Sequence, residues 1–166
     1  MMHLLLAGLA LLVVLVALTA LYFLYSPTPK PPQLKGSLTK EVLDVQGGSR
    51  TYQAYIPRSL PVGAPLVIVL HGTGQTGGAI RKWTNSEFDA LADQNKFAVA
   101  YPDGYKGGWN DCRREGVTPS KKENIDDVAF ISAIIPELES KVGIASNRLY
   151  LFGFSNGGQM SFRLMA

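Results

Sequence analysis

The chain has 166 residues and a net charge of +3, with 16 basic and 13 acidic side chains whose signs are interspersed and that form no long like-charged block. This pattern argues against a nucleic-acid partner, and the length suits one folded domain better than two. Its one cysteine excludes an intrachain disulfide and a cysteine-rich zinc or iron–sulfur site. With two histidines, one of them at position 3, we expect no metal and no cofactor.

The N-terminal segment is strongly apolar. Leu4 to Tyr25 contains no charged residue, and as a helix this stretch would be about 33 Å long, enough to cross a hydrocarbon core of roughly 30 Å. A cleaved signal peptide is the alternative, although its apolar core is usually about 7–15 residues long and Ala17–Ala20 offers a mediocre cleavage site. We therefore interpret residues 1–25 as a signal anchor or a signal peptide, and the protein as exported. The flanking charges leave the membrane orientation open.

A proline-rich spacer follows. Residues 26–33 read SPTPKPPQ and hold four of the ten prolines of the chain. Proline fixes φ and lacks a backbone donor, so this stretch favours an extended conformation. We assign residues 26–36 to a linker and residues 37–166 to the folded domain.

The remaining sequence predicts strands that alternate with helices. In chain order we expect strands over 38–46, 50–57, 65–70, 97–101 and 148–152, and helices over 79–94, 128–142 and from the end of the last strand to Ala166. Turn residues Gly47 and Gly48 join the first two strands, Asn85 or Ser86 starts a second segment in the first helix, and Pro136 kinks or divides the second helix. Such alternation predicts an α/β fold with an open, mostly parallel sheet.

The last strand-to-helix turn carries the motif G-x-S-x-G. Gly153-Phe154-Ser155-Asn156-Gly157 directly follows a predicted strand and opens a predicted helix, the setting of a nucleophile elbow. A side chain at Gly153 or Gly157 would collide there, because strand and helix approach closely. We therefore predict that Ser155 is a catalytic nucleophile. The alternative is a glycine-rich helix entry with an idle serine.

A second signal lies at the end of the strand 65–70. His71-Gly72-Thr73 occupies the loop that lends a backbone N–H to the oxyanion hole in this architecture, while the residue after the nucleophile lends the other. Thr73 and Asn156 are thus the predicted oxyanion donors. His71 is interpreted as structural rather than as the general base, because it sits where the loop must turn.

Five segments together resemble a known family. LVIVLHG, YPDG, WNDC, NIDDVAFI and RLYLFGFSNGG are similar to the exported poly(3-hydroxybutyrate) depolymerase and feruloyl esterase group, close to carbohydrate esterase family 1, over residues 38–166. The resemblance implies the α/β-hydrolase fold and serine-dependent hydrolysis of a carboxylic ester, on a polyester or on a feruloyl or acetyl ester of a polysaccharide. It also implies that Cys112 occupies a position that pairs with a later cysteine in relatives.

Three other residues in these segments have structural and functional interpretations. Trp109 lies in a loop that such enzymes place near the pocket, but a packing role is equally consistent with the sequence. Asp126 and Asp127 are interpreted as structural, because acidic residues cap the start of a helix and interact favourably with its dipole.

The sequence departs from the family in one respect. In α/β-hydrolases the triad order is Ser, then Asp or Glu, then His, yet the residues after Ser155 read NGGQMSFRLMA. We expect this chain to be the N-terminal portion of an esterase and, as printed, to be close to inactive. A catalytically inactive, membrane-tethered remnant or binding protein and a serine peptidase of the same fold are the alternatives. The identity of the ester and the oligomeric state are left open.

Overall fold

A computed structural model describes residues 2–25, 30–45 and 48–166 of the chain. Two compact units are present, Met1–Lys30 and Pro31–Ala166. The expected spacer falls partly on residues 26–29, and the expected Gly47-Gly48 turn falls partly on residues 46–47. Both of these short stretches lie outside the described residues.

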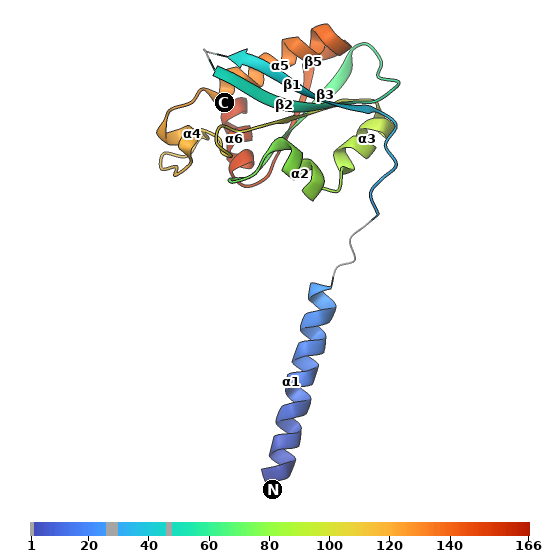
Figure 1. Cartoon of the computed structure of the whole chain (residues 1–166), viewed down its shortest axis with the longest axis vertical. Helices are drawn as coiled ribbons and strands as arrows, with labels where there is room; N and C mark the ends of the chain where they lie inside the picture. The colour runs from blue at the N-terminus through green and yellow to red at the C-terminus, as the bar shows by residue number, and fades with distance from the viewer. Residues whose placement is uncertain (1, 26–29, 46–47) are drawn as a thin grey trace. The chain divides into compact units, whose positions relative to one another are not determined.

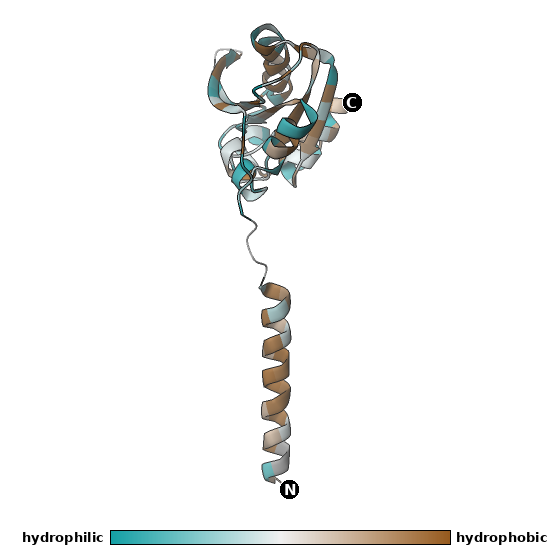
Figure 2. Ribbon diagram, turned by 90° about the vertical axis from the view of Figure 1, so that its right-hand side faces the viewer, coloured by the Kyte–Doolittle hydropathy of each residue, from teal (hydrophilic) through white to brown (hydrophobic). Residues whose placement is uncertain are grey.

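The first unit contains one helix, α1 (Met2–Leu24). Its segment Leu6–Leu24 is long and apolar enough to cross a membrane, and none of it is buried inside the protein. Figure 2 shows the apolar colouring along most of the helix. A membrane anchor and a signal sequence both have these properties, so the two interpretations of residues 1–25 stay open.

The second unit is built on a five-stranded sheet with the strand order β1-β2-β4-β3-β5. Its elements are β1 (Ser37–Val45), β2 (Gly48–Ile56), β3 (Ala64–Leu70), α2 (Gly77–Trp83), α3 (Glu87–Asn95), β4 (Ala98–Pro102), α4 (Pro119–Lys122), α5 (Asp127–Val142), β5 (Ile144–Gly153) and α6 (Asn156–Met165). Strand β3 pairs in parallel with β4 and β5, whereas β1 with β2 and β2 with β4 are antiparallel. The α/β class is confirmed, but the described sheet is mixed rather than mostly parallel.

Helices cover both faces of this sheet. One core joins the sheet to α5 and α6 through Phe130, Ile134 and Met160, and the other joins it to α2 and α3 through Ile80 and Ala92. Figure 1 shows α5 on one side of the strands and α2 and α3 on the other. Strand β3 is accordingly buried along most of its length, as its unbroken apolar run predicts.

Two helix predictions met different outcomes. The first predicted helix is indeed divided, because Asn85 and Ser86 adopt positive φ angles of 51° and 57° between α2 and α3. The second, α5, runs through Pro136 without a break, so of the expected kink or division the division is wrong. Proline removes a hydrogen bond to the carbonyl four residues earlier. That residue is Ser132, whose exposed position lets water satisfy the carbonyl.

Strand β5 is an edge of the described sheet. It is longer than predicted, because it begins at Ile144 and pairs with β3 through a register shift. Tyr150 is 56% exposed, and Phe152 and Phe154 are 38% and 40% exposed. The edge and its aromatic side chains therefore face outward in the described part of the chain, as expected of a half-covered sheet.

Candidate active site

Ser155 occupies a sharp turn between β5 and α6. Its φ of 52° and ψ of −117° are unfavourable for a residue with a side chain. The residue is exposed, and its hydroxyl has no hydrogen-bond partner among the described residues. The turn therefore presents an unengaged hydroxyl at the carboxyl end of β5, which is the geometry of a nucleophile elbow.

The two glycines of the motif make this turn sterically possible. A Cβ on Gly153 would lie 2.3 Å from the carbonyl oxygen of Gly157, and a Cβ on Gly157 would lie 2.3 Å from the carbonyl oxygen of Leu70. These are backbone atoms that cannot rotate away. Because α6 approaches β5 and the end of β3 so closely, Gly153 and Gly157 must be glycine, as the sequence predicts.

The loop after β3 lies against the elbow. The Phe154 N–H donates to the Leu70 carbonyl at 3.0 Å, and a Cβ on Gly72 would lie 3.0 Å from the Phe154 ring. Thr73 is exposed in this loop, and Asn156 is the first residue of α6. Neither backbone N–H has an acceptor within the described parts of the chain. Both are thus available to a ligand oxyanion, and the Asn156 N–H adds the favourable end of the α6 dipole.

Both ring nitrogens of His71 form hydrogen bonds within the domain. The Gly104 N–H donates to its Nε2 at 2.8 Å, so Nδ1 carries the proton and donates to the Gly72 carbonyl at 2.7 Å. The imidazole is fully buried and packs against Trp109. Because both ring nitrogens are engaged, the geometry supports the structural interpretation of His71.

Burial also lowers the pKa of His71 below its usual value of 6.5. A neutral buried histidine binds fewer protons than it does in the unfolded chain, so its contribution to stability is full above pH 6.5 and falls as the pH drops below that value. We expect the free energy of unfolding to fall between pH 7 and pH 5 more steeply than in His71→Gln, with a difference of at most about 1.4 kcal/mol per pH unit. Urea titrations at several pH values measure this difference, and equal slopes for the two proteins would contradict it.

Trp109 takes the packing role of the two that the sequence left open. Its side chain is fully buried, and its indole N–H donates to the His71 carbonyl at 2.9 Å. It therefore lies beneath the site and exposes no surface to a substrate. This placement favours the packing role of Trp109 over the pocket role.

Side-chain hydrogen bonds of Asn156 join the loop that contains Trp109 to the elbow. Asn156 accepts from the Trp109 N–H at 2.8 Å through Oδ1 and donates to Asp111 at 2.6 Å through Nδ2. Asp111 is buried and is also paired with Arg113, and together these hydrogen bonds lower the pKa of its carboxyl against the effect of burial. Asp111 was missed in the sequence, although it stands in the WNDC segment, because no local spacing links it to Asn156.

Asp126 and Asp127 are structural, as predicted, but their tasks differ. Asp126 is the N-cap of α5 and accepts from the Ala129 N–H at 2.9 Å. Asp127 is buried and forms a 2.7 Å ion pair with Arg50, accepts from the Asn110 N–H at 2.7 Å and is hydrogen-bonded to the Ser120 hydroxyl. Asp127 thereby ties the loop before α5 to strand β2.

The fold defines the class: the chain has the α/β-hydrolase fold, with Ser155 at the strained turn between β5 and α6. Comparison with solved structures agrees, because an acetyl xylan esterase from Aspergillus awamori superposes with a TM-score of 0.62 at 22% identity, over 78% of this chain and 46% of the other. No protein-family model matches the chain.

The homologues of the chain are esterases. NocK of Nocardia uniformis subsp. tsuyamanensis, which is named an esterase, is 32% identical over 145 residues, or 86% of this chain and 41% of NocK. The acetylxylan esterase/xylanase XynS20E of Neocallimastix patriciarum is 31% identical over 73% of this chain and 16% of that protein. Feruloyl esterases and a poly(3-hydroxyalkanoate) depolymerase are further relatives, which confirms the resemblance stated above. The chain spans less than half the length of these curated relatives.

Proposed function

We propose that this chain carries the nucleophile and the oxyanion hole of an exported carboxylic ester hydrolase. Ser155 Oγ attacks the ester carbonyl carbon, the carbonyl oxygen takes up negative charge, and the backbone N–H groups of Thr73 and Asn156 bind it. The carbon–oxygen bond to the alcohol then breaks, the alcohol leaves with a proton, and an acyl group remains on Ser155. The substrate class is a polyester or a feruloyl or acetyl ester of a polysaccharide.

One observation carries this proposal: the exposed, positive-φ serine lies between two glycines whose positions admit no Cβ. The backbone of Ser155 is strained, yet its hydroxyl forms no hydrogen bond within the described residues that would explain the strain. Backbone strain of this kind is typical of a functional site. The esterase relatives supply the reaction class. For residues 1–25 and 26–36 we propose a membrane anchor or signal and a spacer, which place the hydrolase domain outside the cytoplasm.

The second candidate is a membrane-tethered protein that binds an ester without turnover. It is favoured by the hydrogen bonds of His71, which engage both of its ring nitrogens inside the domain. A serine on which no imidazole base acts is slow in both attack and deacylation. On this second candidate, an acyl group transferred to Ser155 should persist rather than turn over.

The test is covalent labelling of the full chain in mild detergent. A fluorophosphonate probe and p-nitrophenyl acetate are each expected to add to the peptide that contains Ser155, with release of about one nitrophenolate per chain. Peptide mass spectrometry locates the adduct. A matched peptide p-nitroanilide should react far more slowly, and faster reaction of the anilide would instead support a serine peptidase.

Two variants make the labelling decisive. Ser155→Ala should reduce the adduct to background, whereas Ser132→Ala, which removes an exposed hydroxyl on α5, should leave it unchanged. Labelling that survives Ser155→Ala would refute the assignment of the nucleophile. Reversible ester binding without any adduct would favour the binding protein.

A further inference from the structure

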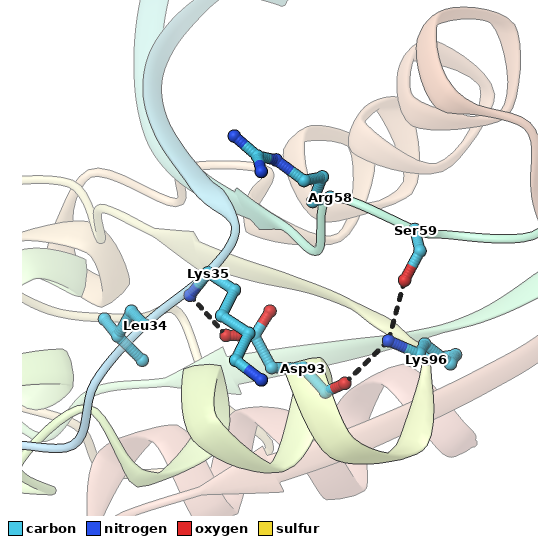
Figure 3. Close-up of a pocket in the computed structure, with 6 residues that line it drawn as sticks. All are labelled: Leu34, Lys35, Arg58, Ser59, Asp93 and Lys96. Carbon is cyan, nitrogen blue, oxygen red and sulfur yellow. Dashed lines mark hydrogen bonds between the residues drawn. The ribbon is translucent and has the colours of Figure 1, made fainter.

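A hollow lies at the opposite end of the sheet from Ser155. Its volume is about 550 Å³, and it is lined by Leu34, Lys35, Arg58, Ser59, Asp93 and Lys96 (Figure 3). Arg58 and Ser59 follow the carboxyl end of β2, which runs antiparallel to β4. This end of β2 therefore meets the amino end of β4, whereas Ser155 follows the carboxyl end of β5. The hollow and the elbow are separate sites.

Positive charge exceeds negative charge in this hollow. Three of its side chains are basic and one is acidic. The acid, Asp93, already accepts from the Lys35 backbone N–H and from the Tyr55 hydroxyl, each at 2.7 Å. Its carboxylate is thus engaged by two neutral donors and forms no ion pair with the basic side chains around it.

The basic side chains still have N–H groups that can donate to a ligand. Lys96 donates to the Ser59 hydroxyl at 2.7 Å and to the Asp93 carbonyl at 2.9 Å, which are both uncharged acceptors (Figure 3). The Arg58 guanidinium has neither a carboxylate nor a hydrogen-bond acceptor among the described residues. A planar guanidinium, two ammonium groups and a hydroxyl line the same hollow, and together they offer donors to the several oxygens of a phosphate group.

The hollow is also where the spacer enters the domain. Leu34 packs against the core that contains Tyr55, the Lys35 N–H is bound by Asp93, and the Gly36 N–H donates to the Tyr55 hydroxyl at 2.7 Å. Nine residues separate Leu34 from Leu24, the last residue of α1. Such a stretch spans at most about 35 Å, so a membrane that holds α1 keeps its headgroups at high effective concentration near Lys35.

We propose that this hollow binds a phosphate group, and that its source is the headgroup of an anionic phospholipid in the membrane that holds α1. Lys35, Arg58 and Lys96 supply the positive charge, and Ser59 supplies a hydroxyl. Binding would hold the domain against the membrane surface through a site independent of the proposed ester hydrolysis. Each basic residue near an anionic surface contributes about a fivefold gain in binding.

Lysine footprinting of the full chain in nanodiscs tests this proposal. We expect the rates of reductive methylation at Lys35 and Lys96 to be about fivefold lower in phosphatidylglycerol discs than in phosphatidylcholine discs. Lys122, the exposed last residue of α4, serves as the internal reference and should not change. Arg58→Gln should remove most of the protection, whereas Arg114→Gln, which removes the same charge from an exposed arginine elsewhere, should preserve it. Arg58 is exposed, so its substitution should leave folding intact.

The other outcomes are equally informative. Protection of both lysines by millimolar inorganic phosphate in phosphatidylcholine discs, with no further protection by phosphatidylglycerol, would overturn the lipid source and leave a site for a soluble phosphate. Equal methylation rates under all conditions would overturn the site itself. Protection that extends to Lys122 would show general attraction to the surface and would likewise overturn a specific pocket.

Discussion

Gly157→Ala is expected to prevent the elbow from forming. A Cβ at this position would lie 2.3 Å from the Leu70 carbonyl oxygen and 2.6 Å from that of His71, which are backbone atoms at and just after the end of the buried strand β3. Overpacking of a core usually costs about 1–3 kcal/mol, because flexible side chains rearrange. Backbone atoms of a buried strand cannot do so, and we expect the free energy of unfolding to fall by more than about 3 kcal/mol.

Urea unfolding followed by tryptophan fluorescence measures this effect. Trp109 is fully buried beneath the elbow and reports on it, whereas Trp83 is 61% exposed. Gly48→Ala is the matched control, since a Cβ there would lie 3.8 Å from the Val45 carbonyl oxygen, an ordinary contact. It should change stability by less than about 1 kcal/mol. Equal stabilities of the two variants would show that α6 can move away from β3, and the steric account of the elbow would fail.

The sequence predicted those parts of the fold that depend on local pattern. The apolar run 65–70 identified the buried strand β3, and Asn85 and Ser86 correctly marked the break between α2 and α3. Local pattern gave a wrong prediction where contact with solvent determined whether a helix continues. Pro136 did not divide α5, because its missing hydrogen bond falls on an exposed turn while Ile131, Ile134 and Leu138 keep one buried face across it.

The candidate site divides in the same way. Ser155 and its two glycines form a contiguous motif, so sequence alone locates the turn. The support beneath it comes from distant segments: Asp111 reaches Asn156 across 45 positions, and Arg50 reaches Asp127 across 77. No periodicity records such contacts, and the direction of the Trp109 side chain depends on them. The packing of Trp109 against His71 could therefore not be predicted from the sequence.

Asp127→Ala is expected to produce the largest loss of stability among the charged residues near the site. Its carboxylate pairs with Arg50, whose side chain is 10% exposed and lies 4.2 Å above the Phe130 ring. It also accepts from the Asn110 N–H and the Ser120 hydroxyl. Removal leaves a buried cation and two buried donors without acceptors, and breaking a buried pair in this way costs about 3–5 kcal/mol.

Asp126→Ala provides the matched control, because it removes the same charge from the adjacent position. Its carboxylate is exposed and caps α5, and loss of an N-cap costs about 1 kcal/mol. Urea titrations measure the stability of both variants. Together with the single variant Arg50→Ala and the double variant Arg50→Ala/Asp127→Ala, they complete a double-mutant cycle, which should yield a favourable coupling energy between Arg50 and Asp127. If Asp126→Ala cost as much as Asp127→Ala, the helix dipole rather than the buried pair would be the dominant effect. If Asp127→Ala costs more stability than Asp126→Ala, Asp127 holds Asn110 in place through its hydrogen bond. The loop at Trp109 and Asn110 is then held by Asn156 as well as by Asp127.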